Sequence, residues 1–162
     1  MQAQNMDEIV LRKLGMPIGD KPVMQPWRDF LDKKKHAKET VRIALVGKYV
    51  ELPDAYKSIN ESLLQAAIYN DRKLDLHFIL SDKLTADNVE KMLGSMDGIV
   101  VAPGFGQRGV DGKIQALKYA REHDVPTFGI CLGMQCMVIE FARNVLGLED
   151  ANSTEMNPHT PF

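Results

Sequence analysis

Residues 127–135 read Thr-Phe-Gly-Ile-Cys-Leu-Gly-Met-Gln, and this stretch joins a short apolar run to a segment whose apolar residues recur at helical spacing. It has the form G-x-C-x-G, the thiol version of a nucleophile elbow between a strand and a helix. So tight a turn imposes strained backbone angles on Cys131, and Gly129 and Gly133 remove the Cβ atoms that would clash there. The turn is predicted to lift the sulfur to the carboxyl end of the strand and the start of the helix, where free N–H groups favour a thiolate.

The alternation of strand and helix extends outward from this turn. The apolar run Val41–Val46 ends at Gly47 and is typical of a parallel strand that is buried on both faces. Asp54 and Thr85 are placed to cap two helices, and Gly147 stands where a helix-ending glycine belongs. The pattern predicts an α/β fold, an open parallel sheet with right-handed crossovers and helices on both faces. The strands are expected over 41–46, 74–80, 97–101 and 125–130, and the helices over 54–68, 85–93, 110–123 and 132–146.

Working residues of such a sheet gather at the carboxyl ends of its strands. Three glycine-marked strand ends qualify: Gly47-Lys48, Pro103–Gly106 and Gly129–Gly133. A thiolate that attacks a carboxamide needs donors for the developing oxyanion, and the backbone N–H of Leu132 is one candidate. The second is expected from Pro103–Gly106, where Gly104 can donate and Pro103, which has no N–H, cannot. Taken alone, Pro103–Gly106 could equally be an ordinary glycine-rich turn.

Composition excludes several classes of function. The chain has 162 residues, of which 44% are hydrophobic and 26% charged, as in a globular protein of one ordinary domain. Its 20 basic and 22 acidic residues give a formal charge of −2, which does not suggest a nucleic-acid groove or a membrane patch. Cys131 and Cys136 lie too close on one predicted helix for a disulfide, and Cys136 is expected to be a core residue. No metal site, no signal peptide and a cytoplasmic location are expected.

Residues 1–41 differ from the rest. An amphipathic stretch over Met6–Leu14 precedes several glycines and prolines, and a short helix is predicted over Pro26–Lys38. These pieces hold too few apolar residues for a core of their own. Residues 1–17 are predicted to be the tail of a preceding domain and residues 18–41 a linker, in which Trp27 packs against a neighbouring domain. Residues 42–162 form the domain with the elbow.

The elbow resembles the nucleophile motif of class I (triad-type) glutamine amidotransferases, and five further stretches narrow the resemblance to the cytidine triphosphate (CTP) synthase family. The resemblance runs from about Arg42 to the last residue, and Met6–Leu14 is similar to the end of that family's amidoligase domain. Pro103 departs from the family, which more often has glycine there. The five stretches are Val46–Tyr49, Glu51–Tyr56, Pro103–Gly109, Phe141–Val145 and Ala151–Glu155.

The resemblance implies a flavodoxin-like glutaminase fold and a function. Cys131 matches the nucleophile that forms a glutamyl thioester, Gly104 and Leu132–Gln135 (Leu132, Gly133, Met134, Gln135) match glutamine-binding positions, and Glu155 matches an acid that helps to hold the substrate. Lys57 matches a basic residue linked to nucleotide-dependent activation, although a solvated helix lysine is an equal alternative. The family's whole enzyme aminates UTP to CTP with ATP, Mg²⁺ and ammonia from glutamine, is activated by GTP and forms homotetramers. No cofactor is expected to bind this part of it.

The family's catalytic His and Glu match no residue here, since none of the four histidines stands at the matching position. They are His36, His77, His123 and His159. The chain is therefore expected to be truncated and to have little or no glutaminase activity alone. Two alternatives remain: a thiol enzyme of related fold, such as a deglycase or protease-like protein, and a regulatory module without chemistry.

Overall fold

A computed structural model describes residues 4–20, 24–52 and 54–162 of the chain. Pro22 and Pro53, which belong to the predicted linker and to one of the stretches above, lie outside the described residues. The chain divides after Asp32 into two compact units, Met1–Asp32 and Lys33–Phe162. The first contains α1 (Met6–Lys13), and α2 (Gln25–His36) begins in the first unit and ends in the second. The helix α2 was predicted over Pro26–Lys38, α1 lies within the stretch described as amphipathic, and neither helix buries a residue. Trp27 is exposed and stacks on Phe30.

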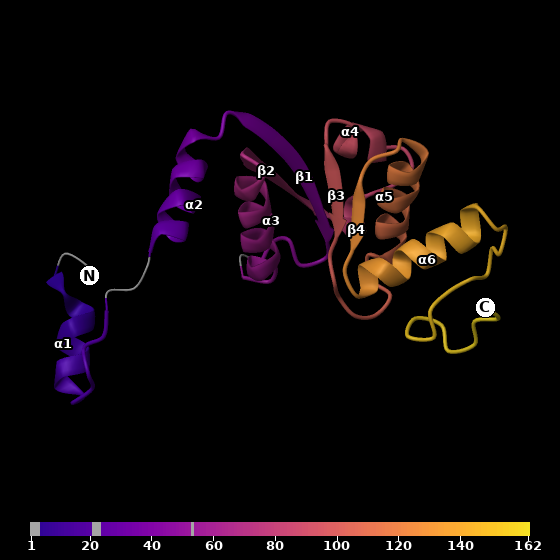
Figure 1. The fold of residues 1–162 in the computed structure, drawn as a ribbon. Helices are drawn as coiled ribbons and strands as arrows, with labels where there is room; N and C mark the ends of the chain where they lie inside the picture. The colour runs from indigo at the N-terminus through magenta and orange to yellow at the C-terminus, as the bar shows by residue number, and fades with distance from the viewer. Residues whose placement is uncertain (1–3, 21–23, 53) are drawn as a thin grey trace. The chain divides into compact units, whose positions relative to one another are not determined.

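The second unit is built on a parallel four-stranded sheet in the order β2-β1-β3-β4 (Figure 1). Its strands are β1 (Glu39–Gly47), β2 (Arg72–Leu80), β3 (Gly98–Val101) and β4 (Thr127–Gly129). All three pairings are parallel, with Leu45 between Phe78 and Val100 in register. The chain goes from β1 to one side for β2 and to the other side for β3, so the strand order reverses between β1 and β3. The predicted fold class is therefore confirmed.

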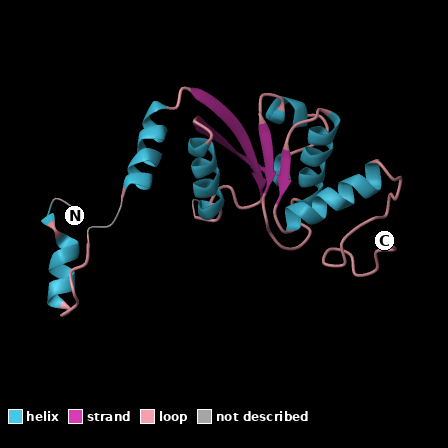
Figure 2. Cartoon of the chain, in the orientation of Figure 1, coloured by secondary structure: helices cyan, strands magenta, loops and turns pink. Residues whose placement is uncertain are grey.

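Helices cover both faces of the sheet (Figures 1 and 2). On one face lies α3 (Lys57–Tyr69), and on the other lie α4 (Val89–Leu93), α5 (Val110–Glu122) and α6 (Leu132–Asn144). Alternate side chains of β1 enter the two cores: Leu45 packs with Tyr56 on the α3 face, whereas Ala44 and Val46 join the larger cluster on the other. This burial on both faces accounts for the unbroken apolar run that predicted the strand.

Two predicted helix caps are wrong. The helix α3 begins three residues after Asp54, because residues 54–57 form a turn that includes the buried Tyr56, and the N-cap has no side-chain hydrogen bond. Thr85 does not cap α4 with its side chain; instead its N–H donates to Asn88 Oδ1 at 2.9 Å, and the helix starts at Val89. Gly147 adopts the predicted left-handed conformation, with φ 72°, just beyond α6.

Candidate active site

Cys131 occupies the sharp turn between β4 and α6. It is the N-cap residue of α6, with φ 54° and ψ −110°, and its side chain is exposed. A non-glycine residue in this region carries a strain of about 1–3 kcal/mol, which the surrounding structure must offset. The predicted elbow is therefore present, with the thiol at a helix N-terminus and open to solvent. Cys136, one turn and a half further on, is fully buried, as predicted, and its burial raises the pKa of the thiol.

Replacing Cys131 with glycine is expected to stabilise the chain by about 1 kcal/mol relative to Cys131→Ala, because glycine adopts this conformation without strain but loses more entropy on folding. Both variants lack the sulfur, so the difference between their free energies of unfolding reports the backbone strain at residue 131. Urea unfolding of the two proteins measures the difference. An alanine variant as stable as the glycine variant would contradict the presence of strain at residue 131.

Both glycines of the elbow are required by close backbone contacts. A Cβ on Gly129 would lie 2.7 Å from the carbonyl carbon and oxygen of Gly133. A Cβ on Gly133 would lie 2.1 Å from the carbonyl oxygen of Val101 in β3. Gly129 thus lets α6 begin directly against β4, and Gly133 lets α6 cross close over β3. The steric role that the sequence predicted for both residues is confirmed.

The loop that follows β3 lies beside the elbow. The N–H of Ile130 donates to Val101 O at 3.0 Å, and a Cβ on Gly104 would lie 3.6 Å from the side chain of Leu132. Among the described residues, none accepts a hydrogen bond from the backbone N–H of Leu132 or from that of Gly104. Two unpaired N–H groups therefore occur on adjacent loops near the exposed thiol, which is the arrangement an oxyanion needs.

Two of the predicted substrate-binding positions, Gln135 and Glu155, meet the loop after β3. Glu155 Oε1 accepts from the N–H of Gly106 at 3.1 Å, and Glu155 Oε2 accepts from Gln135 Nε2 at 3.4 Å. The other amide oxygen, Gln135 Oε1, is buried and has no partner among the described residues. Met134 is half exposed beside Cys131, and Gly133 is buried against β3. A carboxylate such as that of Glu155 can receive the hydrogen bonds of an ammonium group.

Two buried lysines support the same edge, and sequence reasoning missed the role of both. Lys48 is 4% exposed and Lys113 is 0% exposed. Lys48 Nζ donates to carbonyls of the 105–108 loop, and Lys113 Nζ donates to Ala102 O at 2.6 Å. Burial lowers the pKa of Lys113 to about 8, partly offset by the nearby thiols of Cys136 and Cys131. The only sequence signal for Lys48 was its place directly after Gly47 at a strand's carboxyl end.

A model of the family described as glutamine amidotransferase class-I matches residues 51–160, which include the elbow and Glu155. The chain belongs to the class I glutamine amidotransferase family. The family predicted from the elbow is confirmed.

Among relatives of this amidotransferase chain, the CTP synthase of Bacteroides fragilis is 61% identical over 160 residues, covering 99% of this chain and 30% of the relative. The CTP synthase of Porphyromonas gingivalis is 66% identical over 156 residues, covering 96% of this chain and 29% of the relative. The chain thus spans about three tenths of the length of these relatives. A solved structure described as the Trypanosoma brucei CTPS glutaminase domain with bound acivicin matches with a TM-score of 0.70 and 45% identity, over 75% of this chain and 48% of that one.

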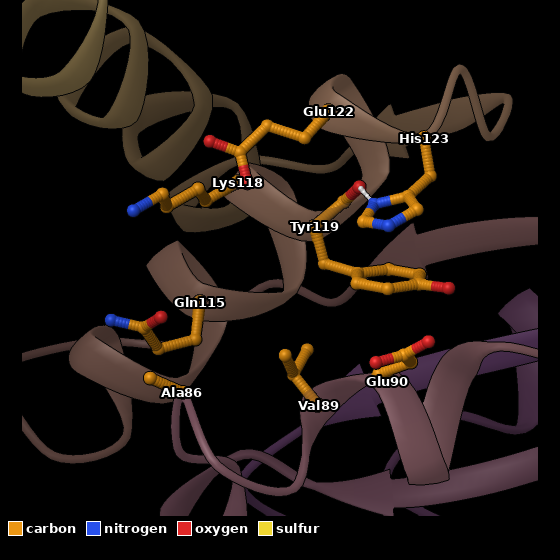
Figure 3. Close-up of a pocket in the computed structure, with 8 residues that line it drawn as sticks. All are labelled: Ala86, Val89, Glu90, Gln115, Lys118, Tyr119, Glu122 and His123. Atoms are coloured by element: carbon orange, nitrogen blue, oxygen red, sulfur yellow. Dashed lines mark hydrogen bonds between the residues drawn. The ribbon is translucent and has the colours of Figure 1, made fainter.

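The histidines of this amidotransferase chain lie where the sequence placed them, in α2, β2, the end of α5 and the terminal loop. His123 lines a cavity of about 220 Å³ between α4 and α5 (Figure 3). Its Nδ1 donates to Tyr119 O at 2.9 Å and its ring stacks on that of Tyr119. Because α5 runs back from the carboxyl edge and ends at Glu122, this cavity is remote from the elbow. In the described part of the chain, no helix is long and apolar enough to span a membrane.

Proposed function

We propose that this chain is the part of a CTP synthase glutaminase that carries the nucleophile, and that it attacks the side-chain amide of glutamine. The supporting observation is the exposed, strained Cys131 beside two loops with unpaired N–H groups. The high identity to CTP synthases favours this family member over other amidotransferases. The same identity argues against the two alternatives, which are a deglycase or protease-like enzyme and a module without chemistry.

In the proposed reaction, the Cys131 thiolate adds to the amide carbon of glutamine. The carbonyl oxygen becomes an oxyanion, which the N–H groups of Leu132 and Gly104 stabilise. The C–N bond then breaks, and the nitrogen leaves as ammonia after taking a proton from a general acid, which gives a glutamyl thioester. Water hydrolyses the thioester to glutamate and regenerates the thiol. We assign the acid–base role to none of the four histidines, because none stands at the position of the family's catalytic His.

Recognition of the substrate's amino acid end is assigned to Glu155 and Gln135. Glu155 Oε1 and Oε2 accept hydrogen bonds from the Gly106 N–H and from Gln135 Nε2, and Gln135 Oε1 is an acceptor without a partner among the described residues. An α-ammonium group supplies three donors, and a hydrogen bond to a carboxylate is roughly twice as strong as one between neutral groups. This separates glutamine from a plain amide that lacks the amino acid end.

The remaining chemistry of CTP synthesis is proposed for the whole protein. Ammonia from glutamine would aminate UTP, with ATP and Mg²⁺ used elsewhere, GTP as activator, and a homotetramer as the assembly. Among the described residues no group of three His, Cys, Asp or Glu side chains could hold a metal ion. Both cysteines are free, which is compatible with the cytoplasmic location that we propose.

Residues 1–17 are proposed to be the end of the amidoligase domain, and residues 18–41 are proposed to be the linker.

A glutamine-analogue affinity label is expected to modify Cys131 at least about tenfold faster than an alkylator of equal intrinsic reactivity that lacks the amino acid end, because binding raises the local concentration of the reactive carbon. Mass spectrometry of the modified chain identifies the cysteine, and free glutamine should slow the reaction. Cys136→Ala is the matched control and should label as the parent does, since Cys136 is buried. Equal rates with both reagents would favour the related thiol enzymes, and an unreactive Cys131 would favour the module without chemistry.

A further inference from the structure

In the part of the chain that the structure describes, the hydrogen-bond partners of the buried Lys48 ammonium all belong to one loop. Its Nζ donates to the carbonyl oxygens of Phe105, of Gly106 at 3.2 Å and of Arg108 at 3.1 Å. An ammonium group has three donors, so these three carbonyls account for all of them. No carboxylate is needed to satisfy the charge, and the loop after β3 is gathered around a single atom that comes from the end of β1.

These contacts also fix the direction of the loop's N–H groups. In a trans peptide the C=O and the N–H point in opposite directions. The carbonyl of Phe105 points to Lys48, so the N–H of Gly106 in the same peptide unit points away from Lys48, and it donates to Glu155 Oε1 at 3.1 Å. One peptide therefore connects the buried lysine to the carboxylate proposed to bind the α-ammonium group.

The stem of Lys48 also lies close to the residue that follows Pro103. A Cβ on Gly104 would lie 2.7 Å from Lys48 Cε. The side chain of Lys48 thus passes directly beneath Gly104, whose N–H is the second proposed oxyanion donor. The far end of the loop is fastened to the same residue, since Arg108 Nη2 donates to the backbone oxygen of Lys48 at 3.0 Å and Arg108 pairs with Asp82.

We propose that Lys48 is a positioning residue for glutamine hydrolysis, which holds the 104–106 backbone so that the Gly104 N–H faces the substrate oxygen and the Gly106 N–H orients Glu155. The inference rests on the proposed function. Lys48 touches no reacting atom; it acts through the loop. If it served only to stabilise the fold, its loss would lower every reaction of Cys131 alike, or none.

The test compares Lys48→Met with Lys113→Met, which removes the other buried ammonium but frees only Ala102 O, the carbonyl that precedes the loop. For each protein, the rate of Cys131 labelling is measured with a glutamine-analogue label and with iodoacetamide, at a pH where the iodoacetamide rate no longer rises. Lys48→Met is expected to lower the glutamine-analogue rate at least about tenfold and to leave the iodoacetamide rate within about twofold. Lys113→Met is expected to change the ratio of the two rates by less than about threefold.

A second measurement covers the case in which Lys48→Met does not fold. Lys48→Arg keeps a buried charge, but its planar guanidinium cannot direct three donors from one atom to the three carbonyls, so it should lower the glutamine-analogue rate more than the iodoacetamide rate. An unchanged ratio of rates in whichever Lys48 variant folds, or equal losses in both rates, would overturn the inference. A parent chain with no preference for the glutamine analogue would overturn the proposed function, and this inference with it.

Discussion

Gly133→Ala is expected to lower the free energy of unfolding by at least about 3 kcal/mol and to abolish selective labelling of Cys131. The added Cβ would lie 2.1 Å from Val101 O, 2.9 Å from Val101 C and 3.2 Å from Val101 Cβ. The first two are backbone atoms of a central strand, so neither can rotate away. The helix α6 would have to withdraw from β3, and the Leu132 N–H would leave the side of Gly104.

Gly98→Ala is the matched control for this prediction. A Cβ on Gly98 also approaches a neighbour, Ile43 Cδ1 at 3.0 Å, but that atom is the end of a flexible side chain that can move. The expected cost is therefore less than about 1 kcal/mol. Urea unfolding of the two variants, together with iodoacetamide labelling of Cys131, measures the effect. Equal free energies of unfolding for Gly133→Ala and Gly98→Ala, within the experimental error, would contradict the close packing of α6 on β3.

The parent chain is expected to gain stability relative to Lys113→Met as the pH rises from about 8 toward 10.5, by up to about 3 kcal/mol if the whole window is covered. Burial lowers the pKa of folded Lys113 to about 8, from 10.5 for the exposed side chain. Above pH 8 the folded chain releases this proton while the unfolded chain still holds it. The unfolded state then binds more protons, so stability rises with pH. Below pH 8 both states are charged, and the difference between the two proteins is constant.

Urea unfolding of both proteins at intervals from pH 7 to pH 10 measures this difference. Cys136 contributes with the opposite sign, because burial raises the pKa of its folded thiol and stability falls once the unfolded thiol ionises. That contribution is larger in Lys113→Met, because the Lys113 ammonium lowers the pKa of the Cys136 thiol in the parent chain, so it adds to the relative gain of the parent chain as the pH rises. The neutral side chain of Tyr56, whose pKa burial also raises, is common to both. A difference that stays constant or shrinks above pH 8 would contradict the buried position of the Lys113 ammonium.

Much of the site could be predicted from the local sequence, because steric contacts between residues that are close in the chain determine it. A nucleophile between Gly129 and Gly133 at a strand-to-helix junction has few possible conformations, and the structure places Cys131 in the strained one at φ 54°. The alternating apolar runs likewise predicted the parallel sheet, since a strand that is buried on both faces has to be apolar throughout. Helix starts were less predictable: Asp54 and Thr85 are good capping residues that the turns around Tyr56 and Asn88 displaced.

The sequence by itself determined the order of strands and helices, the elbow and the identity of the exposed thiol, since each depends on residues only a few positions apart. Tertiary structure decided that the Gly106 N–H meets Glu155, 49 residues away, and that Lys48 lies beneath Gly104 and binds carbonyls up to 60 residues away. A lysine after a strand looks the same in sequence whether it is solvated or buried. Only the fold brings three carbonyls within reach of its ammonium and so makes its burial possible.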